Sequence, residues 1–260
     1  MVMVLANPLA KKKPFSYAPI SFFEGEQRSG KTESALTRPI DATFANMTSV
    51  KLNDGTIVKA EPVFNKQGYA LIGYGKLYIS GSPRIMKIPP KSYVIADSIK
   101  VIYNGHLYGI RYAHMTLSEI IQHLNDGTLE DCYLVVDEAY IGGDRRDGLN
   151  PLVKTVSKLG WQIGKRHIYL EMCLPDSTVL DLRLQKVETE HVICSYDDIT
   201  KKITMLIRNR KKFKNVREVS YYAPLYWKYF DTDEKFTLTD VEIARATAMA
   251  QMGDDNEEDN

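Results

Sequence analysis

The sequence predicts an α/β fold with a mainly parallel sheet flanked by helices, and two observations support this prediction. Between residues 116 and 196, short apolar runs alternate with amphipathic helical segments, as they do where parallel strands are joined by helices. Residues 25–32 read G-E-Q-R-S-G-K-T, a complete G-x-x-x-x-G-K-S/T phosphate-binding loop directly after the apolar run 20–23. Such a loop joins a buried strand to a helix, so both observations predict the same kind of sheet.

The length and composition are typical of one globular domain. A chain of 260 residues can bury one sizeable core and still carry an insertion. No apolar run is long enough to cross a bilayer, and the N-terminus does not have the pattern of a signal peptide, so we expect an intracellular protein. The three cysteines are far apart, without metal-ligand spacing, and we interpret Cys132, Cys173 and Cys194 as reduced packing residues.

Charge is distributed unevenly along the chain. The net charge of +1 combines a mildly basic body with five acids in the last seven residues. Basic residues are densest in 201–217, which fits either contact with a phosphate backbone or a solvated hairpin edge protected by lysines. We expect a flexible basic arm at 1–14, the main domain at 15–252 and a disordered acidic tail at 253–260.

The first half of the chain combines the phosphate loop with β-hairpin signals. A first strand is expected at about 17–23, and Pro39 is expected to end the helix after the loop early. Asp54-Gly55 and Asn104-Gly105 each lie between β-rich flanks and predict two hairpins. These signals indicate a β-rich insertion at about 48–112.

The second half predicts alternating helices and buried strands. Thr116 and Glu119 form a capping box that begins a helix over 117–125. A near-continuous apolar strand then ends in Asp137-Glu138. The further expected elements are a helix over 151–165, a strand at 168–173, a helix after Asp176, a strand at 191–196, and a C-terminal extension with a hairpin around 197–198, an aromatic segment at 221–230 and a helix at 239–252.

The residue types of the loop indicate a nucleotide site. Two glycines let the backbone N–H groups turn towards phosphates, the lysine supplies charge, and the threonine offers a hydroxyl to Mg²⁺. The following helix adds its positive N-terminal end. The expected nucleotide-binding residues are Gly25, Gln27, Arg28, Ser29, Gly30, Lys31, Thr32 and Glu33.

Asp137 and Glu138 are candidates for the rest of a hydrolytic site. If their strand ends beside the loop, Asp137 would hold the Mg²⁺ shell and Glu138 would act as general base towards water. The alternative is that the pair merely ends a strand in solvent. The five histidines show no ligand spacing, so Mg²⁺ is the only metal we expect.

Four arginines are candidates for an arginine finger at the γ-phosphate, although each alone is more often structural. They are Arg145, Arg146, Arg166 and Arg183. The aromatic residues of 221–230 could stack bases, but packing on the sheet is the favoured interpretation.

Over about residues 17–235 the chain resembles the FtsK/HerA superfamily of DNA-pumping ATPases, most closely the genome-packaging ATPases of tailless icosahedral viruses with an internal membrane. The likeness rests on the loop 25–32 and on the strand that ends in Asp137-Glu138. Arg145-Arg146, the segment 164–170, the segment 180–183 and the closing stretch 229–232 add to it by order and spacing.

The resemblance implies a RecA-like P-loop NTPase that binds ATP and Mg²⁺ and forms a homo-oligomeric ring around double-stranded DNA. It implies that Lys31 acts on the phosphates, that Thr32 and Asp137 hold Mg²⁺, that Glu138 activates water, and that Arg146 and Arg166 act in trans. Capsid or membrane vertex proteins would be further partners, in the host cytoplasm or the virion.

One departure from the family pattern concerns the γ-phosphate sensor. Such ATPases usually end the strand after the arginine with a glutamine, but here that strand reads Glu171-Met172-Cys173. Either Glu171 or Asp176 substitutes, or hydrolysis is coupled to movement differently.

Four functions follow as hypotheses. The leading one is an ATP-driven translocase that packages double-stranded viral DNA into a capsid. The alternatives are a HerA-like cellular DNA translocase, an assembly or secretion NTPase of the filamentous-phage type, and a nucleotide-binding protein with an inactive site.

Overall fold

The main sheet has eight strands and is mostly parallel. The computed structural model describes residues 20–26, 28–79, 81–137, 151–174, 186–209 and 216–230. The strand order is β13-β12-β11-β1-β10-β9-β7-β8; β12 and β13 are antiparallel to their neighbours, and the other strands run parallel. The strands are β1 (Ile20–Glu24), β7 (Lys100–Tyr103), β8 (Ala113–His114), β9 (Cys132–Val136), β10 (Ile168–Leu174), β11 (Glu190–Asp197), β12 (Lys202–Asn209) and β13 (Val216–Tyr222).

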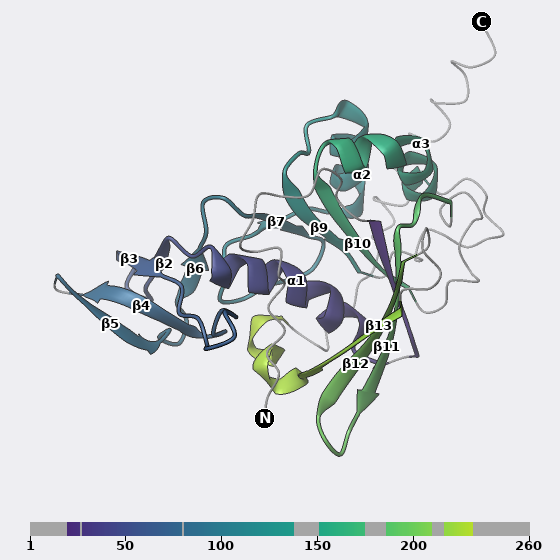
Figure 1. The fold of residues 1–260 in the computed structure, drawn as a ribbon. Helices are drawn as coiled ribbons and strands as arrows, with labels where there is room; N and C mark the ends of the chain where they lie inside the picture. The colour runs from purple at the N-terminus through teal and green to yellow at the C-terminus, as the bar shows by residue number, and fades with distance from the viewer. Residues whose placement is uncertain are drawn as a thin grey trace, which may run out of the picture.

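Helices cover both faces of this sheet (Figure 1). α1 (Lys31–Ala45) lies on one face, while α2 (Leu117–Asp126) and α3 (Pro151–Lys165) lie on the other. Side chains alternate along β1, so Phe22 packs with the α2 and α3 cluster and Phe23 with the α1 cluster. Both phenylalanines are fully buried, which stabilises each contact by roughly 2 kcal/mol. The expected fold class is therefore confirmed.

A second, antiparallel sheet lies beyond the C-terminal end of α1 (Figure 1). Its strand order is β5-β4-β3-β2-β6. The strands are β2 (Ser49–Lys51), β3 (Ile57–Glu61), β4 (Tyr74–Ile79), β5 (Ser82–Lys87) and β6 (Tyr93–Ile95). The predicted hairpin around Asp54-Gly55 joins β2 to β3, and Gly55 has a φ of 88°, which a side chain would disfavour. The C-terminal hairpin around 197–198 is confirmed as β11 and β12.

The hairpin predicted around Asn104-Gly105 is wrong. β7 ends at Tyr103 and pairs in parallel with β8 and β9, while Leu107 makes an isolated bridge to Phe230. The apolar run 101–103 is buried in the main sheet, so the chain enters the core there instead of turning back. Asn104 makes tertiary contacts that its turn propensity did not indicate.

The prediction that Pro39 ends the loop helix is also wrong, because α1 continues to Ala45 with Pro39 inside it. An internal proline costs a helix about 3 kcal/mol or more. The residues after Pro39 offset this cost, since Ile40 and Phe44 are almost fully buried between the two sheets. Tertiary packing therefore overrides a local stop signal.

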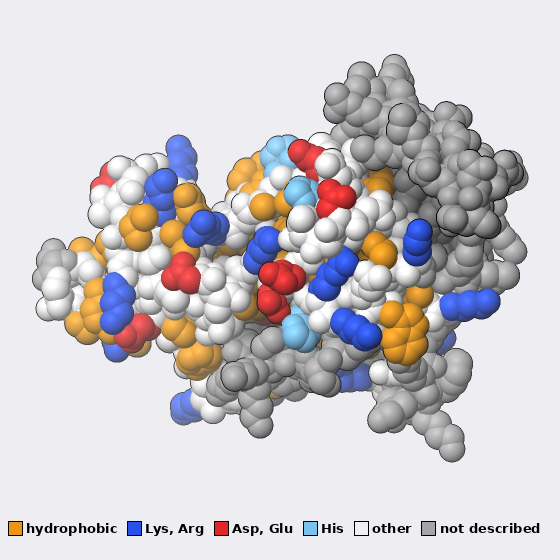
Figure 2. All heavy atoms as spheres, turned by 90° about the horizontal axis from the view of Figure 1, so that it is seen from above, with side chains coloured by type: hydrophobic (Ala, Val, Ile, Leu, Met, Phe, Trp, Pro, Cys, Tyr) orange, Lys and Arg blue, Asp and Glu red, His pale blue; other side chains and the backbone are white. Residues whose placement is uncertain are grey.

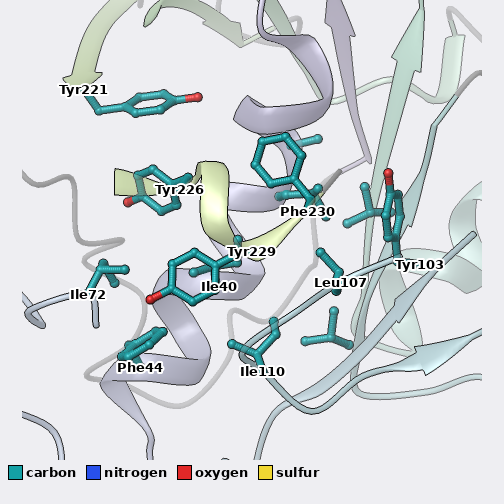
Figure 3. Close-up of a cluster of buried hydrophobic side chains, with 14 of the residues drawn as sticks. Ile40, Phe44, Ile72, Tyr103, Leu107, Ile110, Tyr221, Tyr226, Tyr229 and Phe230 are labelled. Carbon is teal, nitrogen blue, oxygen red and sulfur yellow. The ribbon is translucent and has the colours of Figure 1, made fainter. Parts of the chain in front are cut away.

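The aromatic C-terminal segment packs into the core, as favoured from the sequence. It forms two short 3₁₀ helices, η3 (Ala223–Leu225) and η4 (Trp227–Tyr229). Tyr221, Tyr226 and Tyr229 (Figure 3) each contact a side chain of α1 and are each at most 3 % exposed. Their rings are therefore not available to stack on bases.

Some predicted elements fall outside the described residues, namely the helix after Asp176, the helix at 239–252, the arm and the tail. Among the described residues, no helix is long and apolar enough to cross a membrane. The three cysteines are buried and unpaired, which confirms their role in packing.

Candidate nucleotide-binding site

The phosphate loop follows β1 and leads into α1, and the close packing around it requires its two glycines. A Cβ on Gly25 would lie 2.7 Å from the carbonyl oxygen of Cys194. Gly30 has a φ of 83° and caps α1, and a Cβ there would overlap the side chain of Ile203. Residues of β11 and β12 thus support the loop from behind, and only glycine fits at both positions.

Lys31 is folded over the loop. Its Nζ donates hydrogen bonds to the carbonyl oxygens of Gly25 at 2.8 Å and Glu26 at 2.9 Å. The ammonium group therefore lies at the N-terminal end of α1, where the helix dipole adds positive potential. Both charges favour an anion at this end of the helix.

Thr32 and Asp137 meet at the end of the sheet. Thr32 Oγ1 donates a hydrogen bond of 2.7 Å to Asp137 Oδ2. The strands that precede them in the sequence, β1 and β9, are not neighbours, because β10 lies between them. Asp137 is only 7 % exposed, so this carboxylate does not simply end a strand in solvent; Glu138 lies outside the described residues. A hydroxyl and a carboxylate at this spacing are ligands that suit Mg²⁺.

Asn104 fixes the backbone of Asp137, a contact that sequence reasoning missed. The Asp137 N–H donates to Asn104 Oδ1 at 2.8 Å, and Asn104 Nδ2 donates to the Asp137 carbonyl oxygen at 3.0 Å. This reciprocal pair joins the end of β7 to the end of β9 and orients the carboxylate. Asn104 is a positioning residue for the acidic end of the site.

The residues present fit a nucleotide with its Mg²⁺. Ser29 Oγ is buried in the loop and has no hydrogen-bond partner among the described residues, which is costly unless a ligand supplies one. Together with Lys31, Thr32 and Asp137, it gives a donor set of the kind that phosphates and a hard divalent cation require. Arg28 is exposed in the same loop and has a φ of 64°.

Glu33 contacts the aromatic segment. Trp227 Nε1 donates to Glu33 Oε2 at 3.1 Å, and Oε1 is buried without a partner among the described residues. Burial raises the pKa of Glu33 to about 8, while the Trp227 hydrogen bond acts in the opposite direction. The carboxyl group is therefore mostly protonated at neutral pH and places no full negative charge beside the loop.

Glu171 does not take the place of the sensor glutamine. It lies in the middle of β10 opposite Ser21, three residues before the end of β1 and hence roughly 10 Å from the loop end of the sheet. Its side chain is 1 % exposed, and Arg38 Nη1 lies 3.6 Å from its Oε1. Burial raises the pKa of Glu171 to about 8, and the nearby Glu190 adds to this effect although Arg38 opposes it. Asp176, the other candidate, lies outside the described residues.

Arg38 joins α1 to two carboxylates under the sheet. Its Nη2 donates to Glu190 Oε2 at 2.8 Å and its Nη1 to Ser21 Oγ at 3.0 Å. Burial alone would raise the pKa of Glu190, but Arg38 and Ser21 lower it overall. One ionised and one protonated carboxyl group around Arg38 leave this buried cluster close to neutral.

Arg166 lies just before β10, at the opposite end of the sheet from the phosphate loop. Its guanidinium donates to the Leu124 carbonyl oxygen at 3.0 Å and to Gln162 Oε1 at 2.7 Å. Arg166 is therefore too far from the phosphate loop of its own chain to act there. Gln27, Glu138, Arg145, Arg146 and Arg183 lie outside the described residues.

The chain has remote similarity to several solved structures. No protein-family model matches the sequence, and no curated protein matches it. The N-terminal domain of zonular occludens toxin from Neisseria meningitidis is 14 % identical, with a TM-score of 0.43 over 82 % of this chain and 99 % of that one. The genome-packaging NTPase B204 from Sulfolobus turreted icosahedral virus 2, in complex with AMPPCP, is 9 % identical, with a TM-score of 0.42 over 77 % and 96 %. The RadB recombinase is 10 % identical, with a TM-score of 0.42 over 78 % and 87 %. At these values the functional assignment rests on the geometry of the site.

Proposed function

We propose that this protein is an ATP-driven translocase of double-stranded DNA that packages a viral genome. The hydrogen bond between Thr32 and Asp137 is the observation that carries the proposal, because it joins the phosphate loop to the acid that would share its metal. The resemblance to FtsK/HerA ATPases in the loop, the acidic strand end and the arginines supports DNA as the cargo.

Each residue of the site would have one task. Lys31 and the loop N–H groups bind the phosphates, and Thr32 and Asp137 are the residues that would hold Mg²⁺. When bound, this ion supplies charge neutralisation at the phosphate oxygens. Glu138, directly after Asp137 in the sequence, would accept a proton from the attacking water.

ATP hydrolysis with and without duplex DNA tests the proposal. Wild type should hydrolyse ATP faster when DNA is present, because a translocase couples the two, whereas Lys31→Ala and Glu138→Gln should each lose turnover. Unchanged hydrolysis in Glu138→Gln would remove this residue as the base. Hydrolysis that DNA does not stimulate would favour the assembly or secretion NTPase instead.

Mixing variants tests whether an arginine acts across a subunit interface. Subunits with Arg146→Ala keep an intact loop, and subunits with Lys31→Ala keep the arginine. A mixed ring should therefore recover part of the activity that each variant lacks alone. No recovery at any mixing ratio would exclude Arg146, and the same test applies to Arg166.

A further inference from the structure

A cavity lies far from the phosphate loop, next to the C-terminal end of α1. It has a volume of about 820 Å³, which lies within the range of sites for small ligands. Its floor contains Phe44, which is separated from Lys31 by thirteen steps along α1, or roughly 20 Å. The cavity is therefore separate from the nucleotide site.

Three segments that are distant in sequence form its walls and are hydrogen-bonded to one another. The Val94 N–H donates to the Gly109 carbonyl oxygen, and the Arg111 N–H donates to the Val94 carbonyl oxygen, both at 2.9 Å. The Tyr108 N–H donates to the Tyr229 carbonyl oxygen at 2.7 Å. The walls are thus fixed relative to each other before any ligand binds.

The floor is aromatic and tightly packed. The rings of Phe44 and Tyr229 are edge to face with centroids 5.7 Å apart, and Ile110 lies beside them in Figure 3. A Cβ on Gly109 would lie 2.9 Å from the Tyr229 ring, and Gly109 has a φ of 69°. Glycine at this position therefore lets the 107–112 segment close over the ring.

The walls carry positive charge and no acid. Lys87, Lys91, Arg111 and Lys228 line the cavity, and its lining contains no aspartate or glutamate. Among the described residues, none of the four cations has a carboxylate within ion-pair distance. By contrast, Lys76 and Glu61 on the second sheet form an ion pair at 3.1 Å. Burial and the nearby Lys87 lower the pKa of Lys228. An anion in the cavity would relieve this repulsion.

Figure 2 shows more lysine and arginine than acidic side chains on the part of the drawn face that the second sheet forms. At the cavity itself, Tyr108 is 54 % exposed, so its side chain is accessible to a ligand. Ser92 Oγ, on the lining segment, is buried without a partner among the described residues. The cavity thus offers an accessible tyrosine and four cations.

We propose that this cavity binds an unpaired nucleotide of a DNA strand, with its phosphates among Lys87, Lys91, Arg111 and Lys228 and its base stacked on Tyr108. Cations that follow a backbone and rings that stack on bases are the general means of binding single strands. A duplex hides its base faces, so the site goes beyond the proposed movement of double-stranded DNA. It suits a strand end or a locally opened stretch.

The affinity for a short, fluorescently labelled single-stranded DNA oligonucleotide, measured by fluorescence anisotropy, tests the proposal. All proteins carry Lys31→Ala, so that the phosphate loop contributes little and failure of ATP hydrolysis has no bearing on the result. Lys91→Gln with Arg111→Gln should lower the affinity about tenfold or more and reduce the salt slope by about 1.4, because two phosphate contacts are lost. Lys66→Gln with Lys100→Gln removes two exposed lysines outside the cavity and should leave the affinity within about twofold.

The aromatic ring of Tyr108 is tested separately. Tyr108→Ala should lower single-strand affinity about tenfold, while Tyr108→Phe keeps the stacking face and should retain it. Thermal unfolding confirms that each variant folds. Equal losses in the cavity and control pairs, unchanged affinity in Tyr108→Ala, or binding of free AMP without binding of the oligonucleotide would each overturn the proposal.

Discussion

At the scale of single residues, the site depends on groups that position other groups. Asn104 shows this most directly, because both of its amide hydrogen bonds go to the backbone of Asp137. Arg38 has a comparable role under the sheet, where it holds Glu190 and lies near Glu171. Neither Asn104 nor Arg38 would be chosen as functional from its immediate sequence neighbours.

Replacing Asn104 by alanine should loosen Asp137. The Asp137 N–H and carbonyl oxygen lose their partners, which should lower the free energy of unfolding by about 1–2 kcal/mol. ATP turnover should fall about tenfold, and half-maximal turnover should require more Mg²⁺, because the carboxylate is no longer held in place. Turnover measured against Mg²⁺ concentration distinguishes positioning of the Asp137 carboxylate by Asn104 from a purely structural role. An unchanged Mg²⁺ requirement would contradict it.

Replacing Glu171 by glutamine should change how stability depends on pH. The pKa of Glu171 is about 8 in the folded protein against an ordinary value of 4.5. Between these values the folded state keeps a proton that the unfolded chain has lost, so rising pH lowers the free energy of unfolding of wild type by up to about 1.4 kcal/mol per pH unit, and the effect levels off above pH 8. Glu171→Gln lacks this contribution. Denaturant unfolding at several pH values measures the free energy of unfolding of both proteins. Plotted against pH, the values for wild type and Glu171→Gln should diverge. Parallel plots would show that Glu171 is ionised in the folded protein.

At the scale of elements, α1 is held between the main sheet and the C-terminal segment by polar contacts. Ser34 Oγ and Tyr221 Oη lie 3.1 Å apart, Trp227 donates to Glu33, and Tyr226 Oη donates to Asp41 Oδ1 at 2.7 Å. Burial raises the pKa of Asp41 well above its ordinary value, while the hydrogen bond from Tyr226 acts in the opposite direction. The aromatic segment thus completes the packing of the helix that carries Lys31.

Tyr226→Phe should destabilise the protein through this contact. The change leaves Asp41 without its hydroxyl donor in a dry environment, which should cost about 1–3 kcal/mol. Tyr222→Phe is the matched control, because Tyr222 is 37 % exposed and should change stability by less than about 0.5 kcal/mol. Chemical denaturation measures both. Equal effects of the two substitutions would mean that the Tyr226 hydroxyl does not stabilise the fold.

Local signals in the sequence predicted elements, but not how those elements meet. The capping box of Thr116 and Glu119 and the Asp54-Gly55 turn act between residues close in sequence, and both occur as expected. Pro39 does not end α1, because the packing that offsets the cost of a proline inside the helix comes from other parts of the chain. Asn104 lies 33 residues from Asp137, and the insertion of β10 between β1 and β9 is a property of strand order. Neither the contact between Asn104 and Asp137 nor the strand order leaves a pattern in a short stretch of sequence.

At the scale of the whole molecule, α1 separates two sites with different chemistry. Its N-terminal end carries the phosphate loop and faces Asp137, and its C-terminal end forms the floor of the basic cavity. The main sheet supports the first site, and the second sheet supplies walls of the other (Figure 1).

The central claim is that Thr32 and Asp137 complete a Mg²⁺-nucleotide site across β10. Calorimetric titration with a non-hydrolysable ATP analogue, with and without Mg²⁺, tests it most directly in wild type and in Asp137→Asn. We predict that Mg²⁺ raises the affinity of wild type about tenfold or more and that of Asp137→Asn by no more than about twofold, because the variant lacks the metal-binding carboxylate. The same Mg²⁺ dependence in both proteins would contradict the claim.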